Sequence, residues 1–336
     1  MNRSYSYSAQ FAFDAVHRLQ SLSRRPSRMI RLFALIANRF AVPVSRRLGA
    51  NHIVKAHLYG HTLWMPTEHP LLATLQIFPQ YNRPLGLAVE AIAATRGDNS
   101  VITVIDVGAN IGETVAIIEQ RQPDTCSYLC IDADENIVEL CQLNHTGNDR
   151  IEVKQCFIGE NEGSFVWLED DGRANPSTKL VTEISSAKYD KLVRLDTVAR
   201  PFAETHGHLS FIKVDTEGYD FSVLRSGSAL LSKYGPALYF EWFPKLLTGL
   251  DEKVWGGFEF LKQLGYRHFV FFTSQGDFYC EISDPDRFFL RSLASVTERE
   301  NAFEYFDVFA SISEGVRNEL VERSIAQDIR PPLNKA

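Results

Sequence analysis

Two short segments of this chain place charged side chains and glycines directly after an apolar stretch. The first, residues 104–114, reads VIDVGANIGET, and the second, residues 209–218, reads LSFIKVDTEG. Each apolar stretch is typical of a buried strand, and the charged residues fall where that strand would end. Ligands of open α/β sheets bind at the carboxyl ends of the strands. Both segments are therefore expected to contribute to one site.

The loop of the first segment predicts a nucleoside site rather than a phosphate site. Gly108 and Gly112 have no Cβ, so the backbone there leaves room for a ligand to approach closely. Their G-x-N-x-G spacing differs from the G-x-G-x-x-G of dinucleotide folds, and no P-loop lysine follows. Asp106 and Glu113 would repel a pyrophosphate. A cationic nucleoside with a ribose fits better, and S-adenosylmethionine is one.

Asp132 ends the next predicted strand, 24 residues after Gly108. It would lie beside the end of the first strand, where its carboxylate can accept hydrogen bonds from both ribose hydroxyls. Each such charge-assisted bond contributes about 1.5–3 kcal/mol when well made. Asp134 is expected to cap the helix that follows, which leaves Asp132 free. Asp106 is expected to be buried and to hold the glycine loop through backbone amides; the alternative is that it faces the ammonium of the ligand through water.

The second segment carries Lys213, Asp215 and Glu217 at every second position, so in a strand they would share one face. Methyl transfer to an alcohol requires removal of the hydroxyl proton, which a positioned carboxylate accelerates by typically 10²–10⁴. Asp215 and Glu217 are the candidate bases. The alternative is structural, with Glu217 capping a helix and Lys213 paired to Asp215. Glu241 ends the next strand, and a divalent metal held by Asp215, Glu217 and Glu241 is a further alternative.

Histidine is an alternative base, although no histidine lies in a motif. Those that precede the core and could lie over the cleft are His57, His61 and His69. Four tryptophans could stack on sugar rings, although packing in the core is their commoner role; they are Trp64, Trp167, Trp242 and Trp255.

The elements that would position these residues form a regular pattern from residue 101. Strands are predicted at 101–107, 126–131, 151–157, 209–214, 237–242, 267–273 and 303–311. Helices are predicted at 112–121, 135–145, 219–232 and 252–264. This alternation indicates βαβ units and a parallel sheet. The last two strands have no clear helix between them, which predicts an antiparallel pair at the sheet edge. Residues 169–188 are polar and unpatterned, which predicts a long loop.

The N-terminal part of the chain differs in charge from the rest. Residues 1–50 hold nine arginines, no lysine and one acid, whereas the whole chain has a net charge of −7. We expect residues 1–25 to be mobile and residues 26–48 to be helical, with an apolar stripe within 26–40. That helix either packs on the main domain, lies on an anionic membrane surface or belongs to a transit peptide. Residues 52–66 predict short strands, and residues 70–95 predict helix around Pro84.

Composition places the 336-residue chain among ordinary soluble proteins, with 45% hydrophobic and 23% charged residues. Its five cysteines lack CxxC pairs, which favours free thiols in a reducing compartment. No apolar run reaches the length of a membrane span, and no secretory signal is visible. We therefore expect a cytoplasmic protein, with peripheral contact to the inner face of a membrane through residues 26–40. The acidic remainder of the chain disfavours nucleic acid as a partner.

Together the motifs resemble the FkbM-type family of S-adenosylmethionine-dependent methyltransferases. The resemblance rests on residues 104–114, 131–137 (IDADENI), 193–199 (VRLDTVA), 211–231 and 304–310 (EYFDVFA). Asp132 stands where that family often has glutamate, and Ala133 where it often has proline. The resemblance implies a class I methyltransferase (Rossmann-like) α/β fold with seven strands, mostly parallel with an antiparallel last strand. It also implies O-methylation of sugars, glycans or polyketide-type products.

We accordingly expect a methyltransferase domain at residues 97–315. A basic, partly helical N-terminal extension (1–50), a pre-core segment (51–96) and a C-terminal tail (316–336) would surround it. The expected cofactor-binding residues are Asp106, Gly108, Ala109, Asn110, Gly112, Glu113, Thr114, Asp132 and Ala133. The expected reaction-side residues are Asp215, Glu217, Lys213 and Glu241.

The expected function is S-adenosylmethionine-dependent O-methylation of a hydroxylated acceptor, a sugar, glycan or glycolipid. O-methylation of a polyketide-type or other small natural product is the first alternative. A membrane-surface scaffold with a vestigial cofactor pocket is the alternative of another class. A nicotinamide-dependent oxidoreductase is disfavoured because its glycine motif is absent.

Overall fold

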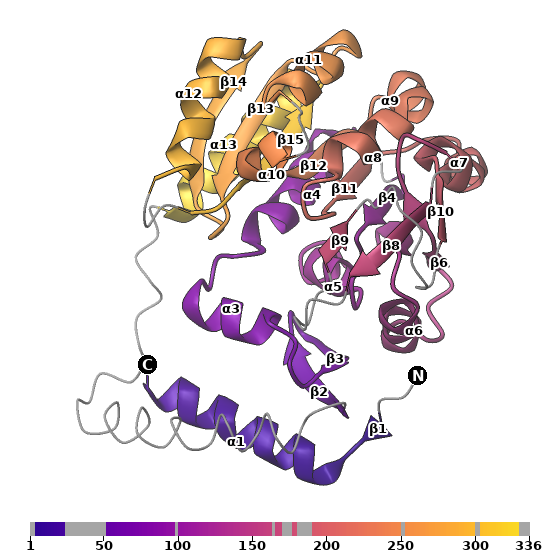
Figure 1. The fold of residues 1–336 in the computed structure, drawn as a ribbon, viewed down its shortest axis with the longest axis vertical. Helices are drawn as coiled ribbons and strands as arrows, with labels where there is room; N and C mark the ends of the chain where they lie inside the picture. The colour runs from indigo at the N-terminus through magenta and orange to yellow at the C-terminus, as the bar shows by residue number, and fades with distance from the viewer. Residues whose placement is uncertain are drawn as a thin grey trace.

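The computed structural model describes residues 4–23, 52–97, 100–162, 165–169, 177–179, 190–249, 253–299 and 303–328. Its centre is an eight-stranded sheet in the order β14-β13-β15-β12-β11-β4-β5-β6 (Figure 1). The strands are β4 (Ile102–Val107), β5 (Cys126–Asp132), β6 (Ile151–Gln155), β11 (Phe211–Val214), β12 (Ala237–Trp242), β13 (His268–Thr273), β14 (Phe278–Ser283) and β15 (Phe306–Ser311).

The sheet is parallel from β6 to β12. β15 lies between β12 and β13 and is antiparallel to both. The chain moves outward through β5 and β6 on one side of β4, and through β11 and β12 on the other. Strand order therefore reverses between β4 and β11, and ligands of such sheets bind at this switch point. The seven predicted strands and the antiparallel last strand are confirmed.

Two expectations about the sheet edge are wrong. β14, which pairs with β13, is an eighth strand and forms the edge in place of the β13–β15 pair. Helix α12 (Arg287–Thr297) lies in the sequence between β14 and β15. Its start carries a local signal, because the Asp286 side chain accepts a hydrogen bond from Phe289 N at 2.8 Å.

Alternation along the strands builds two cores, one on each face of the sheet. Ile105 and Val107 of β4 pack in the first core, and Ile102 and Val104 pack in the second. Helices α7 (Leu195–His206), α8 (Asp220–Ser226), α9 (Ser228–Tyr234), α11 (Gly256–Gln263) and α12 contribute to the first core. Helices α4 (Arg83–Thr95), α5 (Glu113–Glu119), α6 (Glu135–Asn144) and α13 (Glu314–Asp328) contribute to the second.

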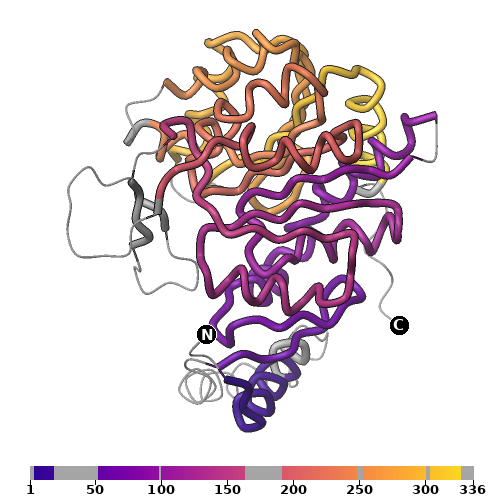
Figure 2. The backbone as a smooth tube through the Cα atoms, turned by 90° about the vertical axis from the view of Figure 1, so that its right-hand side faces the viewer, coloured from indigo at the N-terminus to yellow at the C-terminus, as the bar shows by residue number. Residues whose placement is uncertain are grey.

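The N-terminal segments form a separate layer with a small sheet of β1 (Ser4–Tyr5), β2 (His52–Leu58) and β3 (His61–Pro66). Figures 1 and 2 both place this layer and α1 (Tyr7–Ser23) at the end of the molecule opposite α11 and α12. The expectation of a mobile segment at residues 1–25 is wrong where α1 forms. Ala9, Phe13 and Val16 are buried at helical spacing, and the first two pack in a core shared with the β2–β3 hairpin.

The predicted helix at 26–48 lies outside the described residues. The short strands predicted at 52–66 are confirmed, and they pair as an antiparallel hairpin. Residues 70–95 form α3 (Leu71–Ile77) and α4, with Pro84 in the first turn of α4. Part of the predicted loop at 169–188 is a strand, β9 (Ser177–Lys179). It belongs to a four-stranded sheet with β7 (Phe157–Ile158), β8 (Phe165–Glu169) and β10 (Asp190–Val193).

Residues 314–328, most of which we assign to a C-terminal tail, form α13 against α4. Leu320 and Ser324 of α13 are buried, and Arg323 forms an ion pair with Glu90 of α4 at 3.3 Å. The short helix α10 (Pro244–Gly249) follows β12. Within the described part of the chain, no helix is both long and apolar enough to cross a bilayer.

Candidate active site

The glycine loop after β4 is held in a left-handed conformation at the end of β5. The φ angles of Gly108, Asn110 and Gly112 are 77°, 49° and 83°. Gly108 N and Ala109 N donate to Ile131 O at 2.9 and 3.0 Å. A Cβ on Gly108 would lie 1.9 Å from Asp215 O, so the loop and the end of β11 touch backbone to backbone. The two sequence motifs therefore meet at one point, as predicted.

Asp132 ends β5 directly beside this loop. Its Oδ2 accepts from Asn110 N at 2.9 Å, and its Oδ1 accepts from Asp134 N at 3.1 Å. Asp134 caps α6 by accepting from Asn136 N and Ile137 N, which confirms the predicted cap. Burial raises the pKa of Asp132 to about 6, although the backbone donors oppose that rise. Each carboxylate oxygen has room for a second donor. Asp132 therefore fits a ligand that offers a pair of hydroxyls.

A buried lysine joins the two motifs. Lys213 Nζ donates to Asp106 Oδ1 at 3.0 Å and to Gly108 O at 3.2 Å, and it lies 3.4 Å from Asp215 Oδ2. Burial opposes the charge of Lys213, but Asp106, Asp215 and Glu113 outweigh it and raise the pKa of the lysine. Lys213 is thus paired with one acid from each motif, and the pair with Asp215 is the one that the structural alternative predicts.

The expectation that Asp106 binds backbone amides of the loop is wrong. Asp106 pairs in register with Lys213 across β4 and β11, so both side chains project on the same face of the sheet. The carboxylate therefore bonds Lys213, and Lys213 holds the loop through Gly108 O. Burial raises the pKa of Asp106, and the charge of Lys213 opposes that rise.

Glu113 begins α5 immediately after the loop, and Thr114, which follows it, is buried. The Glu113 Oε2 atom is buried and has no hydrogen-bond partner among the described residues. Burial raises the pKa of Glu113 to about 8, and Lys213 opposes that rise. Ala133, the last of the predicted cofactor residues, is half-buried beside Asp132.

The reaction side is more acidic than predicted. Glu241 of β12 stands opposite Asp307 of β15, and Glu241 N donates to Asp220 Oδ1 at 3.1 Å. Burial and the charges of Asp215, Asp220 and Asp307 hold the pKa of Glu241 well above its usual range. Burial, with a contribution from Asp215, raises the pKa of Asp220 to about 7. These carboxyl groups form one interacting cluster beside Asp215.

Three tyrosines that the sequence reasoning missed border this cluster. Tyr239 hydrogen-bonds Asp307, and Tyr81 hydrogen-bonds Tyr305. Tyr81 precedes α4, and the turn at Gly276 touches its neighbour, since a Cβ on Gly276 would lie 2.0 Å from Gln80 O. No local signal marks Tyr81. Asp307 and Tyr305 lie in the EYFDVFA segment, which only the family resemblance singles out.

Glu217 does not share the face of Lys213 and Asp215, contrary to the prediction. β11 ends at Val214, and Glu217 lies in a turn with a φ of 52° and is exposed. It does not cap α8 either, because Tyr219 occupies the N-cap. Among the described residues, no three His, Cys, Asp or Glu side chains are grouped as a metal ion would require. The three-carboxylate metal alternative is therefore not supported by this arrangement.

Of the three histidines considered as bases, His69 reaches the site. Leu71 N donates to His69 Nδ1 at 3.3 Å, so in the neutral ring Nε2 carries the proton. That nitrogen lies 3.2 Å from Asn110 Oδ1 and donates to it. His69 thereby ties the pre-core segment to the glycine loop. His57 and His61 are exposed on β2 and β3.

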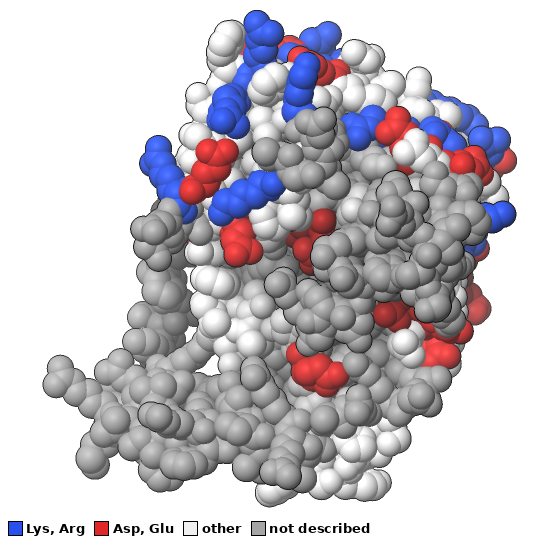
Figure 3. All heavy atoms as spheres, in the orientation of Figure 1, with Lys and Arg blue, Asp and Glu red and all other residues white. Residues whose placement is uncertain are grey.

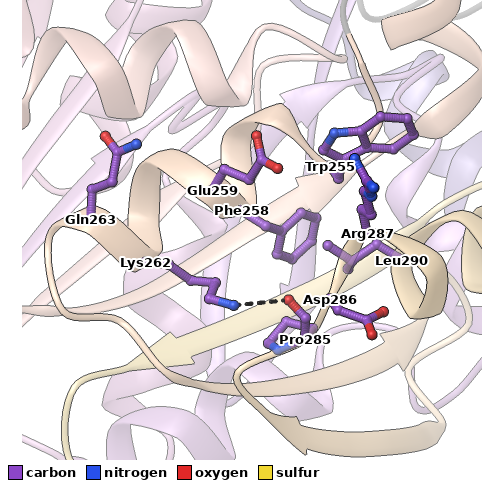
Figure 4. A pocket seen from close by; sticks show the side chains of 9 residues that line it. All are labelled: Trp255, Phe258, Glu259, Lys262, Gln263, Pro285, Asp286, Arg287 and Leu290. Atoms are coloured by element: carbon purple, nitrogen blue, oxygen red, sulfur yellow. Dashed lines mark hydrogen bonds between the residues drawn. The ribbon is translucent and has the colours of Figure 1, made fainter.

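The tryptophans are not part of this constellation where the structure describes them. Trp242 is buried in the core against Phe258, Phe271 and Phe306. Trp255 lines a pocket between α11 and the start of α12, where Lys262 donates to Pro285 O at 3.1 Å (Figure 4). None of the predicted site residues lines that pocket. Trp64 is half-buried on β3, and the Trp167 side chain lies outside the described residues.

Residues 106–267 match the family model of the methyltransferase FkbM domain. This part of the chain is an FkbM methyltransferase domain. The match begins at Asp106, includes most of the first motif and all of the second, and ends just before β13. The domain is that of an S-adenosylmethionine-dependent methyltransferase. The predicted family and cofactor are thereby confirmed.

Several solved structures resemble this chain at low identity. The FkbM methyltransferase from Methylobacillus flagellatus KT is 17% identical, with 72% of this chain and 53% of that chain covered and a TM-score of 0.38. This chain therefore spans about half the length of that protein. The METTL16 methyltransferase domain is 11% identical, with 82% and 80% covered and a TM-score of 0.40. An O-methyltransferase from Bacillus cereus is 11% identical, with 72% and 90% covered and a TM-score of 0.39. No curated protein matches this chain.

The FkbM domain offers a direct test of the ribose contact. Asp132→Ala is expected to weaken binding of S-adenosylhomocysteine at least tenfold, about 1.4 kcal/mol, because it removes the acceptor at the end of β5. Asp134→Ala is the matched control, since it removes a helix cap two residues away and is expected to lower stability by about 1 kcal/mol with affinity retained. Calorimetric titration gives both affinities. Unchanged affinity in Asp132→Ala would remove Asp132 from the ribose.

Proposed function

We propose that this protein transfers a methyl group from S-adenosylmethionine to a hydroxyl of a neutral sugar unit in a glycan or glycolipid. The observation that carries the proposal is the position of Asp215, which touches the glycine loop through its backbone and borders the acidic cluster through its side chain. The cofactor, when bound, supplies an electrophilic methyl group. The protein must hold the acceptor oxygen and take its proton.

Asp215 is the general base in this proposal. Its backbone is fixed because Asp215 N donates to Val107 O at 2.9 Å, and Lys213 holds its carboxylate at 3.4 Å. The side chain is 37% exposed, so an acceptor hydroxyl can reach it. Glu241 is buried, and burial together with the charges of Asp215, Asp220 and Asp307 raises its pKa, which favours its protonated form. Glu217 is exposed in the following turn and is not assigned a role in proton transfer.

The charges around Asp215 favour a neutral acceptor. Asp215, Asp220, Glu241 and Asp307 interact with one another there, and Lys213 is already engaged by Asp106. A phosphate next to the reacting hydroxyl would be repelled by these carboxyl groups. On the face drawn in Figure 3, Lys and Arg side chains gather along the upper part of the molecule, and the charged side chains drawn in colour below them are mostly acidic. Uncharged hydroxyls suit this lining, because carboxyl and tyrosine groups both donate and accept hydrogen bonds.

The same lining ranks the alternatives. A polyketide-type acceptor needs an apolar surface, whereas Asp215 acts electrostatically on carboxyl and tyrosine groups, among them Glu241, Tyr81 and Tyr305. A scaffold with a vestigial pocket needs no functional base, whereas Asp215, Lys213 and the glycine loop form an intact network. The neutral sugar therefore agrees best with the observed groups.

The test combines acceptor screening with two variants. The 336-residue chain is expected to methylate neutral sugars and to leave their phosphate esters unmodified, as measured by transfer of a labelled methyl group. Asp215→Asn is expected to lower turnover by about 10²–10⁴ with affinity for S-adenosylhomocysteine retained. Glu217→Gln, two residues away, is the control and should stay near wild-type activity. Normal turnover of Asp215→Asn would place the base elsewhere, and transfer confined to phosphate esters or polyketide phenols would overturn the acceptor class.

A further inference from the structure

One oxygen of the Glu113 carboxyl group is buried without compensation by a hydrogen bond in the described structure. Its Oε2 atom is buried and has no hydrogen-bond partner among the described residues. Leaving a buried charged acceptor unsatisfied costs more than the about 1–3 kcal/mol of a neutral polar group. Proteins keep such an atom where a ligand or a binding step uses it. Glu113 lies at the start of α5, directly after the glycine loop, so that ligand would sit at the loop.

The surrounding charges show what kind of group is missing. The charged and titratable groups that act on Glu113 are Lys213, Asp106 and Asp215, and Glu113 in turn acts on Tyr59. One cation thus faces three carboxyl groups. The hydrogen bonds of Lys213 go to Asp106 and Gly108 O, and its second ion pair goes to Asp215. Glu113 therefore lacks a cationic donor of its own.

The other acids at the loop are less accessible or already engaged. Asp132 accepts two backbone amides at the end of β5. Asp106 is bonded to Lys213 through Oδ1, and its Oδ2 also lacks a partner among the described residues, but this residue is wholly buried whereas Glu113 is half-buried. An incoming ammonium group therefore reaches the open acceptor of Glu113 more readily than that of Asp106. The amino-acid end of S-adenosylmethionine carries such an ammonium group.

We propose that Glu113 accepts the α-ammonium of the cofactor and releases its own proton to solvent as the cofactor binds. The ammonium keeps its three protons, and the carboxylic acid becomes a carboxylate, so one proton leaves the protein for each cofactor bound. This inference rests on the proposed cofactor site. The raised pKa of Glu113, about 8, agrees with it, because a cation placed beside the carboxyl group lowers that pKa again.

Proton release can be measured without any acceptor or turnover. Calorimetric titration of the full chain with S-adenosylhomocysteine at pH 7, in two buffers of different ionisation enthalpy, gives the number of protons exchanged. The wild type is expected to release close to one proton. 5′-Methylthioadenosine, which has the nucleoside but no ammonium, is expected to bind without proton release.

Substitution then assigns the proton to its residue. Glu113→Gln is expected to bind S-adenosylhomocysteine about tenfold more weakly, to release no proton, and to bind 5′-methylthioadenosine as the wild type does. Glu139→Gln, which removes an exposed acid from α6, is the matched control and should behave as the wild type.

The outcomes separate this inference from the function proposed above. Absence of proton release from the wild type, or the same release from Glu113→Gln, overturns the role of Glu113 while the cofactor site stands. Absence of any S-adenosylhomocysteine binding by the folded wild type overturns the cofactor site itself. If Glu113→Gln fails to fold, the wild-type comparison of the two ligands still decides, since equal proton release with both would exclude the ammonium as its cause.

Discussion

Gly108→Ala is expected to abolish cofactor binding and to destabilise the fold by several kcal/mol. Two costs add at this position. The φ of 77° is unfavourable for a residue with a Cβ by roughly 1–2 kcal/mol. The new Cβ would also lie 1.9 Å from Asp215 O, a backbone atom that cannot swing aside. The loop or the end of β11 must therefore move. Such a movement displaces Asp215 or the Gly108 and Ala109 amides that donate to Ile131 O.

Gly147→Ala separates the two costs. Gly147 has a similar φ of 82°, but nothing lies within 4 Å of the position of its Cβ. Gly147→Ala is expected to be destabilised only by the unfavourable φ angle and to bind S-adenosylhomocysteine as the wild type does. Urea unfolding of both variants, with titration of the ligand, measures the difference. Equal unfolding free energies for the two variants would show that the contact between the loop and β11 is not a constraint in solution.

Lys213→Met is expected to lower the free energy of unfolding by about 3–5 kcal/mol, because it leaves a buried carboxylate without its partner. Asp106 is fully buried, and Lys213 is its ion-pair partner at 3.0 Å. Lys154→Met is the control, since the pair that Lys154 forms with Glu152 is partly exposed and is worth about 0–1 kcal/mol. Adding Asp106→Asn to Lys213→Met should restore much of the loss, because the amide carries no charge.

The same variant has a predictable pH dependence. Burial already raises the pKa of Asp106, and removing Lys213 takes away the charge that opposes this rise. When a carboxyl group has a higher pKa in the folded protein than in the unfolded chain, the free energy of unfolding falls as the pH rises. It increases again as the pH falls and the group takes up a proton. Lys213→Met should therefore be closer to the wild type at pH 5 than at pH 8. A loss that is independent of pH would show that Asp106 does not change its protonation between pH 5 and pH 8 in the variant.

Much of the FkbM domain was predictable because its signals are local. The side chains of each strand alternate between two cores. Asp134 caps α6 through backbone N–H groups no more than three residues away, and the glycine loop follows β4 directly. The elements that were missed depend on distant partners. α1 is stabilised by apolar side chains that face the β2–β3 hairpin, and β14 is a strand because β13 lies beside it.

The acidic cluster illustrates the same limit at the level of single residues. Glu241 and Asp307 are more than sixty positions apart, and they meet because β15 inserts antiparallel beside β12. Tyr81 reaches them from a turn packed against Gly276. The prediction for Glu217 is wrong for a local reason. It applies the two-residue periodicity of a strand to a position three residues beyond the end of β11.

By itself, the sequence determined the order of strands and helices, the glycine loop, the acid that ends β5 and the two motifs that meet at the ends of β4 and β11. Each of these depends on residue types within a few positions of one another. Only the tertiary structure decided that Asp106 bonds Lys213 rather than the loop amides, that His69 donates to Asn110, and that Glu113 keeps an open acceptor atom. The physical reason is that strand register and the packing of the pre-core segment bring these groups together, and neither is encoded in local spacing.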